Sequence, residues 1–357
     1  MPIVIKNIKN SEIDYNDKEF KDFDKIVEYV KLIKPDYKVY LPKKPRGRIE
    51  FEITNTVSDF ANCIRRFLLD EIMVYSMHAD VDNIETDDKF ILNDHLKKRL
   101  ELIPFQQQLS NPDKLKLSLT IKNTTDDIMT VYSRYIKITD DKGKELNSDD
   151  YFSGNIPMIQ LRSDKFLNIN NITITTGYGK EDSGKFCLLS NVSYEILDVI
   201  PYEESKFEKK GESSLNSNPS HFKIGFTTHR NIDPENVIHL CCNGIIERLT
   251  VIQKEISNVK SEETIYFSDL LELEIKNNIK IYHFKGEFWT IANIIARYCY
   301  LEFPAIKFVC ANIIHPSNEE SIVKIIHPNS LNILTAAIKN IISDINILKK
   351  NFKNHSL

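Results

Sequence analysis

The order of apolar and polar residues predicts a strand followed by an amphipathic helix near residue 50. Residues 49–54 alternate apolar and polar side chains, which is typical of a half-buried strand. Ser58 and Asp59 follow a polar turn, and their short side chains suit the N-cap of a helix. The predicted helix has two distinct sides. Its apolar side holds Phe60, Ile64, Phe67 and Leu68 together with Glu71, and its polar stripe holds Asn62, Arg66 and Asp70.

Two longer helices are predicted nearer the C-terminus. Asp233 followed by Pro234 suits a helix start, because Asp is a good N-cap and Pro fits the first helical position. Burying each aliphatic side chain of these helices would contribute roughly 1.5–3 kcal/mol. Their apolar stripes are Ile238, Cys241, Ile245, Leu249, Ile252 and Ile256 in the first, and Leu331, Leu334, Ile338, Ile341, Ile342, Ile345 and Leu348 in the second.

The first helix has a second copy near the C-terminus. Residues 59–66 read DFANCIRR and residues 290–297 read TIANIIAR. Both copies follow a predicted strand and open a predicted helix. This pattern favours two homologous halves. One offset of 231 residues matches Asn62 with Asn293, Arg66 with Arg297, and Glu71 with Glu302.

The remaining segments complete an α+β chain with an insertion. Residues 106–217 contain short alternating runs separated by Asn, Asp and Gly, which predicts a mostly-β domain. We also expect an insertion at 9–47 with a helix over 18–31, a strand over 77–84, a helix over 93–102, an exposed linker over 203–218 and a strand over 222–227. The predicted divisions are 1–48 (first strand and insertion), 49–105 (first half, first part), 106–217 (mostly-β insert), 218–260 (first half, second part) and 261–357 (second half).

Composition excludes several classes of protein. The 357 residues carry a net charge of −4, whereas a dedicated nucleic-acid binder normally has a basic bias. We expect no transmembrane helix, because no apolar run reaches about 18 residues. Residues 1–10 lack the apolar core of a signal peptide. The six cysteines form no C-x-x-C pair, so we expect buried, reduced thiols and no metal site.

The strongest enzymatic motif is a phosphate-loop pattern, and its context argues against it. Residues 179–185 read GKEDSGK, which satisfies G-x-x-x-x-G-K. Phe186 stands where a Mg²⁺-binding Ser or Thr is needed, and a strand-like run follows instead of a helix. We therefore interpret it as a basic turn between strands. The acidic doublets at 126–127, 140–141 and 149–150 are expected to be solvated, and the histidines show no zinc-hydrolase spacing. We predict no catalytic residue, cofactor or metal.

Several motifs resemble the assembly subunits of multisubunit RNA polymerases. ANCIRRFLLDEI (61–72) with FILNDHLKKRLELIPF (90–105) resembles the third subunit of eukaryotic RNA polymerase II, whose assembly domain is shared by the archaeal D and bacterial alpha subunits. MTVYS (129–133) and TGYGKE (176–181) are similar to the same subunit. The run from 284 to 326 resembles the small eleventh subunit, although Trp289 and Ala292 replace the usual His and Gly. The arrangement is similar to a third–eleventh subunit fusion of large DNA viruses.

This resemblance implies two alpha-subunit-like dimerisation domains in one chain, paired through a helical interface. It implies a non-catalytic assembly subunit of a nucleotidyltransferase complex, in the virion and host cytoplasm if viral and otherwise in the nucleus. The implied partners are the second-largest and largest subunits and small subunits resembling the tenth and twelfth, with no sequence-specific nucleic acid and no membrane. The implied interface residues are Asn62, Arg65, Arg66, Asn293 and Arg297, and the implied dimerisation residues are Phe60, Ile64, Phe67, Ile245, Leu249, Ile252, Ile338, Ile342 and Ile345.

Two alternatives remain open from the residues themselves. Arg66 could simply pair with Asp70 at i, i+4, a contact that contributes only about 0.3–0.5 kcal/mol on a surface, and the Asn side chains could bond to the neighbouring turn. The chain could also be a stand-alone module whose β domain binds a ligand or another protein.

Overall fold

The molecule is an α+β protein with several antiparallel sheets. The helices that the structure describes with bounds are α2 (Ser58–Asp70), α3 (Asn93–Glu101), α4 (Pro234–Asn258), α5 (Trp289–Glu302) and α6 (Ser330–Lys350). The computed structural model describes residues 2–13, 32, 46–105, 107, 109, 111–152, 156–198, 219–228, 232–259, 264–286, 289–303, 305–315 and 320–353.

Two of the sheets share one topology. The first sheet has the order β1 (Val4–Ile13), β2 (Arg46–Thr54), β12 (His221–Thr228), β11 (Leu189–Ile196). The second has the order β14 (Leu271–Lys276), β15 (Ile279–Lys285), β17 (Glu320–Ile326), β16 (Phe308–Ile313), with β13 (Tyr266–Phe267) beside β14. Each set runs along the chain as two strands, a helix, two strands and a helix, and all neighbouring strands are antiparallel. α2 is therefore equivalent to α5, and α4 to α6, in agreement with the internal repeat.

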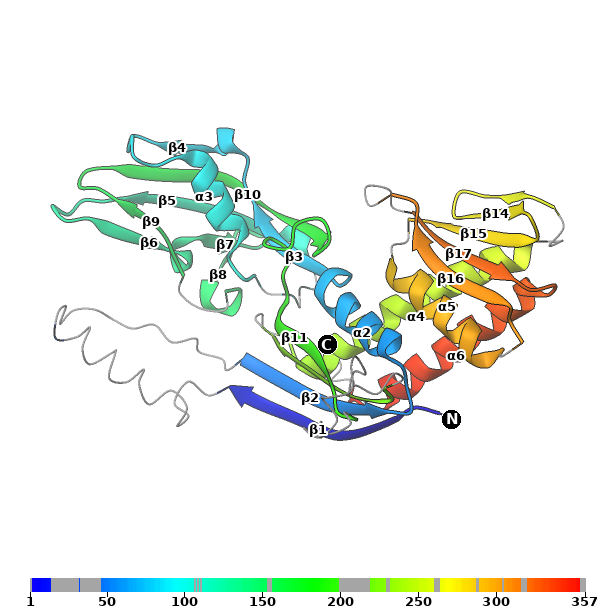
Figure 1. Cartoon of the computed structure of the whole chain (residues 1–357). Helices are drawn as coiled ribbons and strands as arrows, with labels where there is room; N and C mark the ends of the chain where they lie inside the picture. Colours follow the sequence, from blue (N-terminus) through cyan, green and yellow to red (C-terminus); the bar gives the residue numbers. More distant parts are fainter. Residues whose placement is uncertain are drawn as a thin grey trace, which may run out of the picture.

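The four equivalent helices pack on one another within the single chain. α2 contacts α4 within the first half, and α5 contacts α6 within the second. Between the halves, α2 contacts α5 and α4 contacts α6 (Figure 1). The four helices therefore form one packed cluster, and buried apolar side chains of each belong to a common core.

One core cluster holds the residues predicted for this interface. Of these, Ile342 is only half-buried and packs against the margin of the cluster. The others are buried in it: Phe60, Ile64, Phe67, Ile245, Leu249, Ile252, Ile338 and Ile345. The N-cap of α4 also agrees with prediction, since the Asp233 side chain accepts the N–H of Glu235 at 2.7 Å.

Helix α6 is long and apolar enough to cross a membrane by length and composition, which the sequence analysis did not expect. A core helix passes the same test, and this one contacts both α4 and α5. Its residues Ile338, Ile341 and Ile345 are fully buried in the shared core. The apolar side chains of α6 therefore pack against other helices of the same chain.

The remaining strands form a separate lobe with its own core (Figure 1). Its main sheet has the order β3 (Met73–His78), β10 (Phe166–Tyr178), β5 (Lys116–Lys122), β7 (Lys137–Thr139), β8 (Glu145–Leu146). β4 (Ile84–Thr86) pairs with β10, and β6 (Met129–Tyr132) pairs with β9 (Pro157–Leu161). We call this unit the β lobe.

Sheet membership differs from the predicted divisions at two strands. β3 lies before residue 106 and yet pairs with β10, so it belongs to the β lobe. β11 lies before residue 217 and pairs with β12, so it completes the first half. The prediction of one strand over 77–84 was wrong, because the chain forms β3, a 3-10 turn at Val81–Asn83 and then β4. The predicted helix over 18–31 and linker over 203–218 lie outside the described residues.

Candidate functional site

Helix α2 begins where predicted but is capped differently. Val57 is the N-cap residue, and no side chain caps the helix, so the expected Ser58 or Asp59 cap is not formed. The acid Asp59 instead lies in the first turn, where its charge is favourable to the helix dipole. This leaves the Asp59 carboxylate available to another element.

Arg65 is held in place by the predicted polar stripe. Its Nε and Nη2 atoms donate to Asn62 Oδ1 at 3.0 and 2.8 Å, across one helical turn. Both residues are half-buried. The Asn62 amide therefore orients the Arg65 guanidinium, which retains further N–H donors for a partner.

Arg66 does not form the expected ion pair with Asp70. No ion pair joins these two side chains or links Arg66 to any other described residue. Burial raises the pKa of the Asp70 carboxyl above its usual value, and the positive charge of Arg66 opposes this rise without reversing it. The predicted i, i+4 ion pair between Arg66 and Asp70 is therefore not formed, although the two charges still influence each other.

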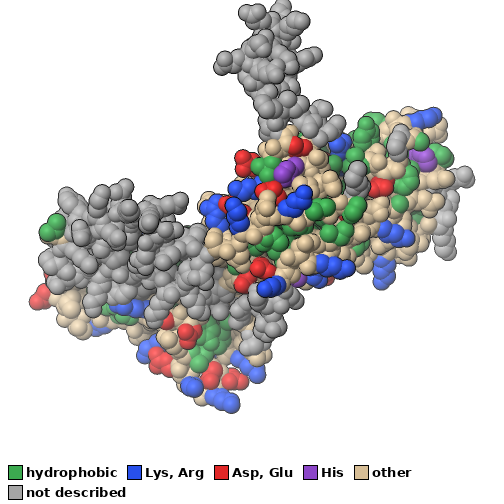
Figure 2. All heavy atoms as spheres, turned by 90° about the horizontal axis from the view of Figure 1, so that it is seen from below, with side chains coloured by type: hydrophobic (Ala, Val, Ile, Leu, Met, Phe, Trp, Pro, Cys, Tyr) green, Lys and Arg blue, Asp and Glu red, His purple; other side chains and the backbone are tan. Residues whose placement is uncertain are grey.

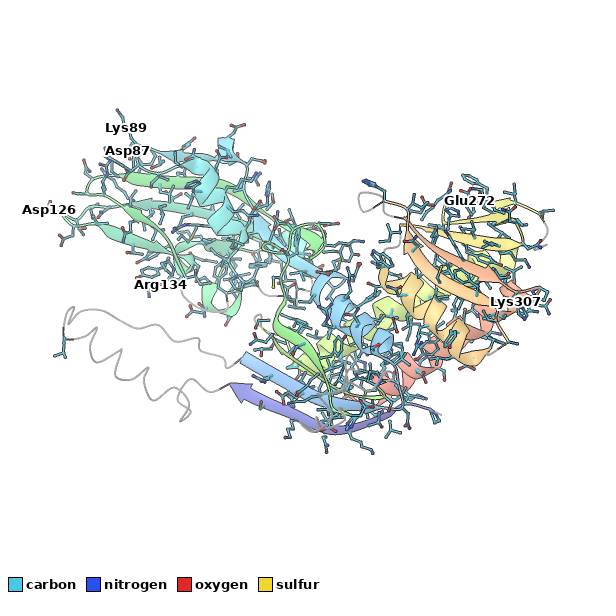
Figure 3. The ribbon with its side chains drawn as sticks, in the orientation of Figure 1. Asp87, Lys89, Asp126, Arg134, Glu272 and Lys307 are labelled. Carbon is cyan, nitrogen blue, oxygen red and sulfur yellow. The ribbon has the colours of Figure 1, made fainter. Side chains whose placement is uncertain are left out.

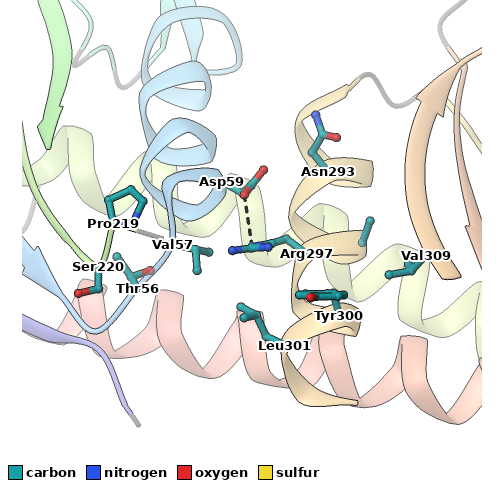
Figure 4. Close-up of a pocket in the computed structure, with 11 residues that line it drawn as sticks. Thr56, Val57, Asp59, Pro219, Ser220, Asn293, Arg297, Tyr300, Leu301 and Val309 are labelled. Carbon is teal, nitrogen blue, oxygen red and sulfur yellow. Dashed lines mark ion pairs between the residues drawn. The ribbon is translucent and has the colours of Figure 1, made fainter. Parts of the chain in front are cut away.

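Asn293 and Arg297 lie in a groove between the two halves (Figure 4). The groove has a volume of about 630 Å³ and is formed by α2, α5, β16 and the residues just before β12. Arg297 Nε lies 3.8 Å from Asp59 Oδ2, and its guanidinium lies 5.6 Å from the ring centre of Tyr300. The lining residues are Thr56, Val57, Asp59, Pro219, Ser220, Asn293, Ala296, Arg297, Tyr300, Leu301 and Val309.

The structure thus separates the five predicted interface residues into two groups. Asn293 and Arg297 line the groove, whereas Asn62, Arg65 and Arg66 do not. Sequence reasoning missed Asp59, which it assigned to a cap, and the exposed pair Tyr300 and Leu301. The sequence could have indicated Tyr300 and Leu301, because positions 293, 297, 300 and 301 share one helical face.

The phosphate-loop pattern is a structural turn. Residues 179–185 form turns between β10 and β11, and no helix follows them. Lys185 Nζ lies 3.3 Å from Glu101 Oε1, and Lys98 Nζ lies 2.6 Å from Asp182 Oδ2, so both ion pairs tie the turn to α3. A Cβ atom on Gly179 would lie 2.5 Å from the Leu69 carbonyl oxygen. The glycine permits the turn to pack directly on the end of α2.

The buried acid Glu101 lies where the helices contact the turn that leads out of the β lobe. Burial alone would raise the pKa of Glu101. The hydrogen bond from His78 and the charges of Lys185 and Lys98 lower the pKa by more than burial raises it, so the pKa lies below its usual value. Glu71 at the end of α2 accepts from Arg248 of α4 at 2.5 Å and lies 3.5 Å from Lys180. These ion pairs join α2, α3 and α4 to the turn between β10 and β11.

Thiol and acidic groups give no further candidate chemistry. Cys63, Cys241, Cys242 and Cys299 are buried thiols that form no disulfide. Burial raises the pKa of the Cys242 and Cys299 thiols to about 12, so both stay protonated and unreactive at neutral pH. In the described ranges, no group of three His, Cys, Asp or Glu side chains could hold a metal. Asp126 lies in an exposed turn at the tip of the β lobe (Figure 3), as expected for the doublets.

The outer face of the first sheet is a mixed-charge surface. Glu50 lies 2.6 Å from Arg48 Nη2 and 3.0 Å from Lys223 Nζ, and His221 lies 2.9 Å from Glu52. Figure 2, viewed from this side, shows acidic and basic side chains next to one another. Opposite charges on this face neutralise each other, so it offers no basic track for a phosphate backbone.

Comparison with known proteins adds no relative. No protein-family model matches this chain, and no curated protein matches it either.

Proposed function

We propose that this chain is a non-catalytic assembly subunit of a multisubunit DNA-dependent RNA polymerase. It would act as an internal third–eleventh subunit heterodimer that binds the second-largest and then the largest subunit. The observation that carries the proposal is the repeated topology, in which equivalent helices of the two halves contact each other within one chain. Such an arrangement performs the task of a subunit dimer without a second chain.

The polar residues of α2 support a docking role. Asn62 orients Arg65, and Arg66 lies beside it with no ion pair among the described residues. Arg is favoured at protein interfaces because its planar guanidinium makes several hydrogen bonds at once. We infer that Arg65 and Arg66 contact the second-largest subunit. Arg297 is already engaged with Asp59, so its role is to join the halves as well as to line the groove.

Mass spectrometry of the native complex tests the proposal. A tagged full-length chain, purified from its natural source, should bring down the two large subunits in a ratio of about one to one. Small subunits resembling the tenth and twelfth are expected in the same complex. Recovery of the chain alone, or with a ligand in its β lobe, would instead favour a stand-alone binding module and refute the assembly role.

A further inference from the structure

We propose that strand β16 is the docking edge for an extended, uncharged segment of a large polymerase subunit, which adds as a sixth strand to the second sheet. This inference rests on the proposed function and names the part of the partner that binds. It is carried by the open edge of β16, by the chemistry of the groove beside it and by the lack of charges and bulges along the described residues of this strand.

The outer edge of β16 has backbone groups that point away from its neighbour. β16 is the last strand of its sheet and pairs only with β17 among the described strands. The N–H of Ile313 is donated to the Asn312 side chain at 2.8 Å, so this N–H does not take part in the ladder with β17. Because residues two apart direct their backbone groups to the same side, Val309 and Ala311 also direct theirs outward.

Three other edge strands, β1, β11 and β3, are protected. β1 carries Lys6 and Lys9 with a register shift between them, and β11, the equivalent of β16 in the first half, has a shift between Ser190 and Ser193. The free edge of β3 is covered by Gln107, whose amide bonds to both the N–H and the carbonyl of Tyr75. Charges, bulges and covering groups are the usual means of preventing edge pairing.

Along its described residues β16 carries no charge and no bulge, and the only covering group is the Asn312 side chain on the N–H of Ile313 at the end of the strand. Its sequence is FVCANI, with no charge, no proline and a continuous register against β17. Phe308 is 43% exposed and Ile314, directly after the strand, is 56% exposed. A flat apolar edge of this kind is a template for strand addition.

The groove next to the edge indicates the chemistry of the segment. Val309 joins the edge to the groove, where Tyr300 and Leu301 supply exposed apolar surface. The charges of Asp59 and Arg297 offset each other, and the other described residues that line the groove are uncharged. Exposed Lys307 (Figure 3) lies just before β16 and outside this lining. A neutral groove beside free backbone groups fits an uncharged extended peptide and fits neither a nucleic acid nor a highly charged helix.

Hydrogen exchange of the full chain, alone and in the purified complex with the large subunits, tests the inference. The amides of Val309 and Ala311 should exchange rapidly in the chain alone and at least about tenfold more slowly in the complex. Slow exchange already in the isolated chain would show that the chain covers its own edge, and would overturn the inference. If light scattering shows a dimer and the same amides are protected in it, the occupant of the edge is a second copy of this chain. That result would also overturn the inference.

Two variants separate this inference from the proposed function. Ala311→Pro removes an outward N–H, which an edge strand tolerates, and should weaken binding of the large subunit about tenfold. Ala311→Ser keeps the N–H and is the control. If Ala311→Pro fails to fold, Asn312→Lys puts a blocking charge on the exposed side of the edge and should weaken binding similarly. Unchanged binding with unprotected amides overturns only the strand addition, whereas failure to recover any large subunit overturns both proposals.

Discussion

Arg297 on α5 lies 3.8 Å from Asp59 on α2, and this ion pair crosses the boundary between the two halves. The internal repeat makes Arg66 the equivalent of Arg297 and Thr290 the equivalent of Asp59. These equivalent positions therefore hold one acid for two arginines. Thr290 stands where the acid for Arg66 would be, so Arg297 forms an ion pair across the boundary, whereas Arg66 forms none with a described residue.

Thr290→Asp should supply the missing acid. We expect the new carboxylate to attract Arg66 across the boundary and to raise the free energy of unfolding by at most about 1 kcal/mol, as partly exposed pairs do. Because Arg66 would then be occupied, pull-down of the second-largest subunit should weaken. Thr290→Asn has a similar shape without the charge and should change neither property. Equal recovery of the subunit by both variants would argue that Arg66 does not dock.

Replacement of Arg65 and Arg66 by Ala should affect assembly more than folding. The opposite side of α2 already supplies its core contacts through residues such as Phe60 and Ile64, so the free energy of unfolding should change by under about 1 kcal/mol. Within an interface, each Arg could contribute roughly 2 kcal/mol or more, so the second-largest subunit should be lost from pull-downs. Thermal unfolding and pull-down measure the two effects. A large fall in melting temperature would assign these arginines to the fold.

Ile341→Ala should strongly destabilise the whole chain. Ile341 is fully buried in α6, within the core shared by both halves. Removing its side chain leaves a cavity that costs about 2–5 kcal/mol. Ser343→Ala, on the exposed side of the same helix, should cost little and is the control. Equal denaturation midpoints for the two variants would contradict the four-helix core.

Asp344→Asn should change how stability depends on pH. Burial raises the pKa of the Asp344 carboxyl, and the hydrogen bond from Tyr298 at 2.7 Å opposes the rise only in part. Between the usual carboxyl pKa and this raised value, the folded chain keeps a proton that the unfolded chain has released. The contribution of Asp344 to the free energy of unfolding is therefore greatest at low pH and falls as pH rises through this range.

The Asn variant cannot titrate and still accepts the Tyr298 hydroxyl. Its stability relative to the natural chain should therefore increase from about pH 4 to about pH 7 in denaturant titrations. Asp126→Asn, at the exposed tip of the β lobe, is the control and should follow the natural chain (Figure 3). A constant difference between Asp344→Asn and the natural chain at all pH values would show that Asp344 ionises as readily in the folded state as in the unfolded one.

The sequence by itself determined the local elements and which of their sides are buried. The stripe from Ile238 to Ile256 is buried along α4, and the Asp233 cap is formed, because periodicity and capping depend on residues within a few positions of one another. The repeat at one offset predicted two homologous halves, and two sheets of the structure share one strand order. The rejection of the phosphate loop also followed from local context, since a strand was expected after Phe186.

Only the tertiary structure decided which elements and side chains become neighbours. Alternation identifies β11 and β3 as strands but does not specify their partners, so the predicted divisions assigned both to the wrong sheet. Helical spacing suggested Arg66 with Asp70, whereas the observed pair joins Arg297 to Asp59, more than two hundred residues apart. Such long-range contacts depend on how the packed halves bring distant surfaces together, and no short sequence window contains that information.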